Sequence, residues 1–190
     1  LAGRRHFAAV GVALEKNERG AGNSIDFQVS SDSIPHDFRS VVEEGLRDGL
    51  STGVLGNFPL VDIRVAVVHG QWHPVDSSEI AFRSAASMAL REAARLARPA
   101  LLEPIMALEI VSPEEHLGDV LGDLNVRRGQ VKDVAQRDGI RVIEATVPLA
   151  ELFGYATTLR SLTRGRAGYT MEPTRFDVVP ESLCQELMNR

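Results

Sequence analysis

Residues 69–82 concentrate the side chains of this sequence that could do chemistry. The stretch reads HGQWHPVDSSEIAF and holds two histidines, one aspartate, two serines and one glutamate. An apolar run precedes it and an alanine-rich run follows it. These residue types are compatible with a hydrolase site, with a metal site, or with an exposed loop that leads into a helix.

Neither a hydrolase site nor a metal site is well supported. A nucleophilic serine, its histidine and a carboxylate must converge to within about 3 Å, and they normally come from separate segments of the chain. Here His73, Asp76 and Ser77 are close neighbours, and the stretch contains no Gly-x-Ser-x-Gly sequence. His69 and His73 have the spacing of helical metal ligands, but Pro74 disfavours a helix and no further Cys or His is near. We therefore expect no catalytic residue and no metal site in this chain.

The segment DSSE within the stretch is typical of a helix start. Asp76 can accept hydrogen bonds from the free amides of the first turn, while Glu79 reaches back to the cap. We therefore expect Asp76, Ser78 and Glu79 to serve mainly the structure. Capping does not account for Trp72 and His73, which precede the helix at a tip. A ring and an imidazole at an exposed tip could stack on bases or contact RNA phosphates.

The apolar periodicity predicts a chain of the α+β class with two small domains, residues 1–100 and 101–190. Both are expected to be α/β sandwiches, in which helices cover a sheet. In the first domain we predict strands over 7–14, 24–31 and 58–70, a helix over 38–51, and a helix from 77 to near Pro99.

The second domain is predicted to have the order β-α-β-β-α-β, which is that of a ferredoxin-like fold. A hairpin turning at Asp138–Gly139 lies at its centre. A short helix is expected to end the chain. The predicted elements are a strand over 104–113, a helix over 116–129, the hairpin over 131–148, a helix over 152–165 and a strand over 167–179.

Composition limits the cellular setting. The chain of 190 residues is 44% hydrophobic, which is enough for one core or two small ones. Its single cysteine, Cys184, rules out an intramolecular disulfide and favours a reducing compartment. No apolar run approaches the roughly 20 residues that span a bilayer. We expect a soluble, cytoplasmic monomer, and the missing initiator methionine suggests a fragment of a longer chain.

The arginines gather although the formal net charge of −5 by itself argues against a nucleic-acid partner. The late cluster, beside Gly165, could hold phosphates or an acidic partner. The alternative is a salt-bridged surface, with Glu151 or Glu172 as partners. The gathered arginines are Arg4 and Arg5, Arg127 and Arg128, and Arg160, Arg164 and Arg166.

Three longer stretches resemble a known family. HPVDSSEIAFRSAAS is similar to the domain IV loop and helix of elongation factor G, the translational GTPase that drives ribosomal translocation. LLEPIMALEIVSPEEHLGDVLGDLNVRRG and PLAELFGYATTLRSLTRGRAGYTM are similar to its domain V. The likeness covers about residues 7–179. It implies a domain IV fold of the ribosomal-S5-domain-2-like type, with its first strand upstream of Leu1, and a ferredoxin-like domain V.

The resemblance also implies partners and contact residues. Domain IV would reach the decoding region of the small subunit, where tRNA and mRNA move, and domain V would face large-subunit rRNA and the stalk-base protein. GTP and Mg would bind a domain upstream, since no Gly-x4-Gly-Lys-Ser/Thr occurs here and no cofactor is expected in this fragment. The implied tip residues are Gln71, Trp72, His73, Pro74, Val75 and Asp76, with a second loop of Gly3, Arg4, Arg5 and His6. The implied domain V residues are Arg128, Arg160, Arg164 and Arg166.

Two departures from the family pattern leave the role of this copy open. Usual members carry an acidic residue where Pro74 stands, and their first tip loop reads Gly-Arg-Gly-Gln-Tyr-Gly rather than AGRRHFAAV. A paralogue specialised for ribosome recycling is the alternative within the family. Outside the family, the alternative is a stand-alone ferredoxin-like enzyme or ligand-binding protein.

Overall fold

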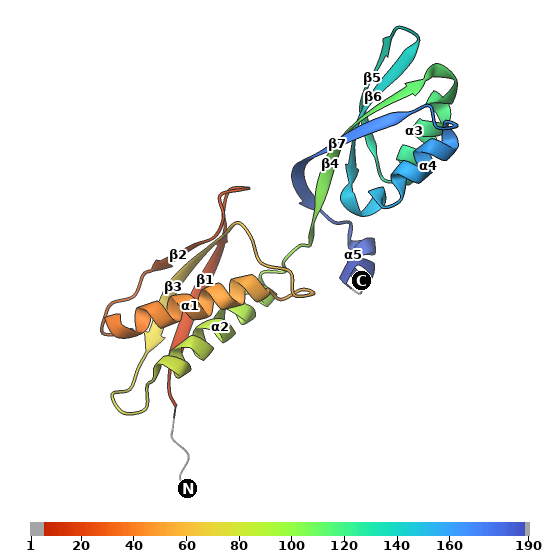
Figure 1. Cartoon of the computed structure of the whole chain (residues 1–190). Helices are drawn as coiled ribbons and strands as arrows, with labels where there is room; N and C mark the ends of the chain where they lie inside the picture. Colours follow the sequence, from red (N-terminus) through yellow and green to blue (C-terminus); the bar gives the residue numbers. More distant parts are fainter. Residues whose placement is uncertain (1–5, 189–190) are drawn as a thin grey trace. The chain divides into compact units, whose positions relative to one another are not determined.

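The computed structural model describes residues 6–188, and Figure 1 shows their helices and strands. The chain divides into two compact units, with the boundary between Pro99 and Ala100. We call the first unit 1 and the second, which extends to Gln185, unit 2. No helix of the described residues is long and apolar enough to cross a membrane.

Unit 1 is a three-stranded sheet with two helices. The sheet order is β1-β3-β2, and the central β3 is antiparallel to β1 and parallel to β2. Each element corresponds to one that the sequence predicts. The elements are β1 (Ala9–Lys16), β2 (Ser24–Phe27), α1 (His36–Thr52), β3 (Ile63–Gln71) and α2 (Glu79–Leu96).

Strand β3 begins at Ile63, so the predicted strand over 58–70 is wrong in its first residues. Asp62 has φ 56°, a left-handed conformation that a strand does not accommodate. The backbone amide of Leu60 donates to the carbonyl oxygen of Leu50 at 2.8 Å, so this segment folds back on the end of α1. The segment therefore contacts the end of α1 and does not take the extended conformation that its alternating apolar residues predict.

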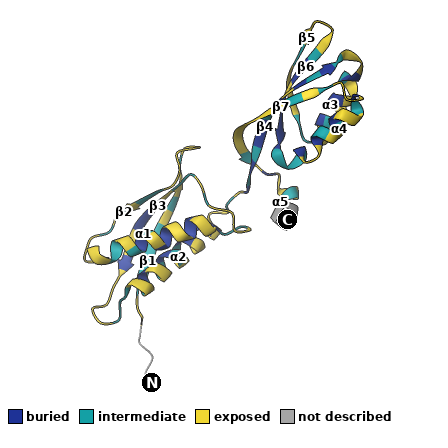
Figure 2. Ribbon diagram, in the orientation of Figure 1, coloured by how far each residue is buried: buried dark blue, intermediate teal, exposed yellow. Residues whose placement is uncertain are grey.

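The core of unit 1 forms where both helices meet the sheet. Leu46 of α1, Phe82 of α2 and Val67 of β3 are all fully buried. In Figure 2 the buried residues lie on the inner sides of these elements and the exposed residues on their outer sides. The 3.6-residue period of the helices and the two-residue period of the strands therefore bury a common apolar face.

Two glycines allow α1 and α2 to approach closely. A Cβ atom on Gly45 would lie 2.4 Å from the carbonyl oxygen of Arg83, and one on Gly49 would lie 2.6 Å from Cδ2 of Leu90. The first clash is with the backbone of α2, so a side chain at position 45 would push the helix away, whereas a side chain at position 49 would force Leu90 to repack. The missing side chains therefore set the distance between the two helices.

Unit 2 is a four-stranded antiparallel sheet of order β5-β6-β4-β7, with α3 and α4 against it (Figure 1). This arrangement confirms the predicted α+β class. The hairpin turn is confirmed too, because Asp138 and Gly139 have φ 48° and 81°, as a type I′ turn requires. The elements are β4 (Leu102–Pro113), η1 (Glu114–His116), α3 (Leu117–Val126), β5 (Gln130–Arg137), β6 (Ile140–Pro148), η2 (Leu149–Leu152), α4 (Tyr155–Leu162), β7 (Gly168–Val178) and α5 (Glu181–Met188).

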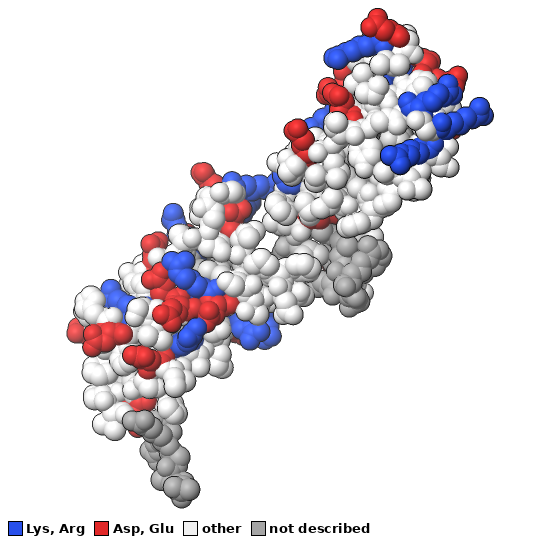
Figure 3. All heavy atoms as spheres, viewed as in Figure 1, with Lys and Arg blue, Asp and Glu red and all other residues white. Residues whose placement is uncertain are grey.

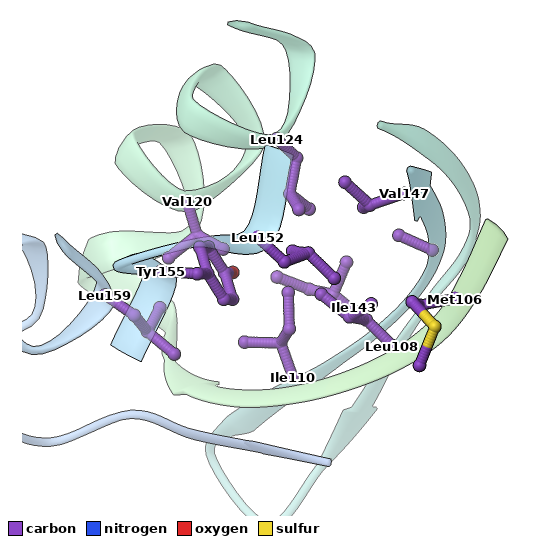
Figure 4. Close-up of a cluster of buried hydrophobic side chains, with 11 residues drawn as sticks. Met106, Leu108, Ile110, Val120, Leu124, Ile143, Val147, Leu152, Tyr155 and Leu159 are labelled. Carbon is purple, nitrogen blue, oxygen red and sulfur yellow. The ribbon is translucent and has the colours of Figure 1, made fainter. Parts of the chain in front are cut away.

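The core of unit 2 lies between the sheet and the two helices. Ile110 of β4, Ile143 of β6, Leu124 of α3 and Leu159 of α4 converge there (Figure 4). The ring of Tyr155 fills the space between them and meets Tyr169 edge to face, with 5.0 Å between centroids. One face of the sheet is therefore covered by helices, and the other face is not part of this core.

Helix α4 is shorter than predicted. It begins at Tyr155 because the preceding Gly154 has φ 74°, and residues 149–152 form the separate turn η2. At the other end Gly165, with φ 78°, donates its amide to the carbonyl oxygen of Arg160 at 2.8 Å. Arg164 therefore lies in the turn beyond the helix, with φ 52°, and not one helical turn above Arg160 as its spacing indicates.

The cap of α2 is Ser78, so the prediction of an Asp76 cap is wrong. The hydroxyl of Ser78 accepts a hydrogen bond from the backbone amide of Ala81 at 3.3 Å. Asp76 instead lies beside His73, with 3.3 Å between Oδ2 and Nδ1. The chain turns between the two positions, and this turn places the aspartate outside the reach of the first helical amides.

Replacement of Gly45 by alanine should destabilise unit 1. In an open helix the change would stabilise by about 0.5–1 kcal/mol, but here the methyl group meets a backbone oxygen, and overpacking costs about 1–3 kcal/mol. Gly118→Ala in α3, where nothing lies within 4 Å of the new Cβ, is the matched control and should stabilise. Urea unfolding followed by circular dichroism measures both; a stabilised Gly45→Ala variant would contradict the close approach.

Replacement of Ser78 by alanine should cost about 1 kcal/mol, because an orphan amide of α2 loses its acceptor. Asp76→Ala should cost less, since that carboxylate accepts no helical amide. Trp72 is the only tryptophan and lies in unit 1, so its fluorescence during urea unfolding reports this unit. Equal losses in the two variants would argue that Asp76 shares the cap.

Candidate functional site

The loop between β3 and α2, residues 72–78, forms a tip that the N-terminal segment braces. The amide of Phe7 donates to the carbonyl oxygen of Asp76 at 2.9 Å. In return, the Ser77 hydroxyl donates to the carbonyl oxygen of Phe7 at 2.8 Å and accepts from the amide of His73 at 2.9 Å. The tip is thus held by bonds to a segment some 70 residues away, not by the turn alone.

A third segment, residues 28–35, supports the tip from another side. The indole Nε1 of Trp72 donates to the carbonyl oxygen of Asp32 at 3.1 Å. Ile34 is fully buried beneath Gly70, where a Cβ atom would lie 2.2 Å from its Cγ1. None of the residues predicted for the site from the sequence lies in this segment. Its run SSDS before Ile34 is a turn signal, but no local pattern indicates which loop it joins.

The three segments surround an open pocket of about 440 Å³. Its charged side chains, apart from His73, are two aspartates, and no lysine or arginine of the described residues lines it. Contacts made there would therefore use rings and hydrogen bonds, and not the neutralisation of phosphate. The lining residues are Phe7, Asp32, Ser33, Gly70, Gln71, Trp72, His73 and Asp76.

His73 presents one ring nitrogen to solvent. Its Nδ1 lies 3.3 Å from the backbone N of Val75 and 3.2 Å from that of Asp76, and it accepts from both. A neutral imidazole that accepts at Nδ1 carries its proton on Nε2. Nε2 has no hydrogen-bond partner among the described residues, and the side chain is 53% exposed. In this neutral form Nε2 is therefore a donor without a hydrogen-bond partner among the described residues.

The hydrolase arrangement is not assembled in this geometry. The Ser77 hydroxyl bonds two backbone groups, and its bond to His73 is to the main-chain amide and not to the ring. A serine held in this way has no base to remove its proton. Among residues 6–188, no group of three or more His, Cys, Asp or Glu side chains could hold a metal ion.

The other predicted tip residues are exposed wherever the structure describes them, apart from Asp76, which is half-buried. Trp72 is 40% exposed and Val75 is 83% exposed, and Gln71 and Pro74 are exposed as well. His6 lies near the helix start, with its Nδ1 3.1 Å from the Ser78 hydroxyl. The other three predicted residues of this loop, Gly3, Arg4 and Arg5, lie outside the described part of the chain.

In unit 2 the structure assigns Arg128 to an internal ion pair. Its guanidinium donates to both oxygens of Glu103, at 2.6 and 2.9 Å, and to Glu151 at 3.0 Å. Glu103 in β4 is only 6% exposed, and Glu151 lies in η2. Arg128 therefore links these two elements within the fold. The hydrogen bonds to Glu103 raise the pKa of Arg128. The carboxylates of Glu103 and Glu151 therefore neutralise its charge inside unit 2.

Arg127, which follows α3, is also internal. Its guanidinium donates to Asp123, to the carbonyl oxygen of Glu151 and to the hydroxyl of Thr158, and it stacks 5.1 Å from the centre of the Tyr155 ring. The spacing of two arginines before a glycine gave no indication of these contacts, because their partners come from other elements.

Arg166 is partly engaged as well. It donates to Glu115 and, at 2.8 Å, to Nε2 of the buried His116. The bond from Arg166 holds the pKa of the Glu115 carboxyl below its usual range. The salt-bridge partners expected for the late cluster are therefore wrong. Arg166 pairs with Glu115, whereas Glu151 pairs with Arg128 outside that cluster and Glu172 forms no ion pair among the described residues.

Arg160 and Arg164 are the two members of the predicted cluster that stay available. Both are exposed, and neither has an ion-pair or hydrogen-bond partner for its side chain among the described residues. Figure 3 shows a group of basic side chains over the helices of this unit. Of the four predicted contact residues of unit 2, these two are the ones that donate to no carboxylate of the described residues.

Comparison with known proteins gives the same relationship over both units. The family model "Elongation factor G, domain IV" matches residues 1–98, and "Elongation factor G C-terminus" matches residues 100–187. Elongation factor G of Chlamydia caviae is 46% identical over 188 residues, which cover 99% of this chain and 27% of that protein.

A crystal structure of a Thermus thermophilus protein is similar too, with a TM-score of 0.79 and 36% identity. The match covers 95% of this chain and again 27% of the other. The chain thus spans about a quarter of the length of the proteins that it matches. With a family match over each unit, the chain belongs to the elongation factor G family and comprises its domain IV and its C-terminal domain.

Proposed function

We propose that this chain is the ribosome-binding C-terminal module of a GTPase that promotes translocation of tRNA and mRNA. In this proposal unit 1 enters the decoding region with its tip, and unit 2 contacts large-subunit rRNA and the stalk-base protein. The observation that carries it is the braced tip, where Trp72 and the free Nε2 donor of His73 are exposed. Family membership supports the wider role in protein synthesis.

The tip would act by occupying space in a fixed orientation. The hydrogen bonds of Asp76 and of the Ser77 hydroxyl to the backbone of Phe7, and the indole bond to Asp32, hold it without a contribution from the ligand. An element that is already ordered loses little conformational entropy when it binds RNA. The exposed ring can stack on a base, and His73 can donate to a phosphate or hydroxyl oxygen.

Unit 2 would bind by neutralising phosphate charge. Arg160 near the end of α4 and Arg164 in the turn after it are exposed and have no ion pair or hydrogen bond to a carboxylate among the described residues, so an RNA backbone can pair with them without breaking an internal ion pair. Arg128 and Arg166 would instead keep the local structure in place through Glu103 and Glu115.

The parent protein would supply the energy for this movement. GTP and Mg would bind a domain upstream of residue 1, and this chain would perform no bond chemistry itself. Its contribution would be mechanical. The rigid tip of unit 1 would occupy space, and the arginines would anchor unit 2 to RNA. A recycling role remains the alternative within the family, because Pro74 departs from the acidic residue of usual members.

Replacement of His73 by alanine in the full-length protein should slow translocation while leaving ribosome-stimulated GTP hydrolysis nearly intact. The variant removes the free donor of the tip but changes nothing in the upstream domain. Rapid kinetics of tRNA movement and of phosphate release measure the two steps separately. His69→Ala is the matched control, since His69 is an exposed histidine of β3 that does not line the pocket, and it should behave as wild type.

Equal loss of both steps in His73→Ala would argue that the tip is not the translocating element. If wild-type protein splits post-termination ribosomes but does not translocate, the recycling alternative holds.

The double variant Arg160→Gln/Arg164→Gln should weaken ribosome binding and flatten its salt dependence. Two lost phosphate contacts should reduce the slope of log K against log salt by about 1.5. Co-sedimentation at several salt concentrations measures this slope. Arg64→Gln/Arg91→Gln in unit 1 removes the same charge from exposed positions and is the control. An equal loss of slope in both variants would mean that only net charge matters.

A further inference from the structure

The uncovered face of the unit 2 sheet carries a row of acidic side chains. In the strand register, Glu144 of β6 lies directly opposite Glu109 of β4 on one side and opposite Asp133 of β5 on the other. All three are exposed. Three adjacent strands therefore place three carboxylates side by side across the sheet.

The register also assigns these residues to the face away from the helices. The pairs Leu108–Ala145 and Ile110–Ile143 belong to the core on the helical side. Glu109 and Glu144 lie between these pairs in both strands, so their side chains point to the opposite face. In Figure 3 acidic side chains lie along the margin of unit 2 that is opposite the group of basic ones, with some basic side chains among them.

The row is unusual because its carboxylates lie directly opposite one another and no cation of the described chain pairs with them. Directly opposed like charges destabilise a sheet, with Cβ atoms only about 4.5–5.5 Å apart. Some other exposed carboxylates of this protein are paired, such as Asp48 with Arg83 and Glu114 with Arg141. Glu109, Glu144 and Asp133 have no ion pair or hydrogen bond from a described residue.

The positions around the row are small or lack polar partners. The next row toward the hairpin consists of Ala135, Val142, Val111 and Gly168. On the other side lies Thr146, which is only 3% exposed and whose hydroxyl makes no hydrogen bond within the described chain. A long side chain can therefore lie flat on this face, with an unused hydroxyl and carboxylates to receive its polar end.

The chemistry of the row determines what it can bind. RNA is excluded because its phosphates carry the same charge as the row. A single bound metal ion is excluded by geometry, since no three acidic or histidine side chains of residues 6–188 converge on one point. Lysine and arginine side chains remain, because they offer apolar stems and several donors to carboxylates.

We propose that this acidic sheet face binds a lysine- and arginine-rich protein surface of the ribosome. The choice of the ribosome rests on the proposed function, because proteins that bind RNA carry such basic surfaces. Unit 2 would then use its two sides differently: Arg160 and Arg164 on the helical side contact RNA, and the acidic row on the sheet side contacts protein. Glu172, near the row in β7, would extend the contact.

The first test uses the double variant Glu109→Gln/Glu144→Gln in this chain and a deca-arginine peptide as the probe. We expect the variant to bind the peptide at least about five times more weakly than wild type at low salt. Its melting temperature should stay equal or rise, since a like-charge pair is removed. Asp119→Asn/Glu181→Gln, which removes two exposed carboxylates of other elements, is the control and should bind as wild type. Equal weakening in both variants overturns the inference, whatever ribosome assays show.

The second test locates the partner on the ribosome. The full-length protein carries a photo-crosslinking amino acid at Thr170, which is exposed at the β7 end of the row opposite Glu109. A crosslink to a basic ribosomal protein supports the proposal, whereas one to rRNA or within the factor itself overturns it. The same group at the exposed Thr157 of α4 should label RNA. Absence of all ribosome crosslinks at both positions would argue against the proposed function, and the peptide result would still decide whether the row binds cations.

Discussion

The tip depends on one steric constraint, which is the missing side chain at Gly70. Ile34 occupies the place where a Cβ atom would lie, at 2.2 Å, and is fully buried there. This contact brings residues 28–35 to the end of β3, where Asp32 can accept from Trp72. The exposed ring and imidazole are positioned because a buried isoleucine, some 40 residues away in sequence, fits against bare backbone.

Unit 2 distributes its arginines between structure and surface. Arg127 and Arg128 have their donors satisfied by carboxylates, a carbonyl and a hydroxyl, so they connect α3, β4, η2 and α4. A buried carboxylate such as Glu103 requires this compensation, since an unpaired charge in the interior is costly. Arg160 and Arg164 donate to no carboxylate of the described residues, although the charge of Arg164 is near enough to help lower the pKa of Glu115. Arginines of unit 2 therefore have two roles: some connect elements of the fold, and others are candidates for contact with RNA.

In the acidic row, too, the tertiary structure determines which charges lie together, here with negative side chains. Glu109 and Glu144 are 35 residues apart in sequence, and only the antiparallel register places them opposite each other. A protein that folded without a partner would gain by replacing one of them, because opposed like charges reduce stability. Their combination with small neighbours is more easily understood as a surface that a cationic partner completes.

The sequence alone determined the fold class, the order of all major elements, the hairpin at Asp138–Gly139 and the family, because each follows from local periodicity, turn chemistry or an extended motif. It was wrong where neighbours in space compete with local preference, as at the start of β3 and at the cap of α2. Only the tertiary structure decided which charges are free. An arginine has no carboxylate partner, or two, depending on which distant strand or helix end packs beside it, and that depends on the whole core rather than on spacing along the chain.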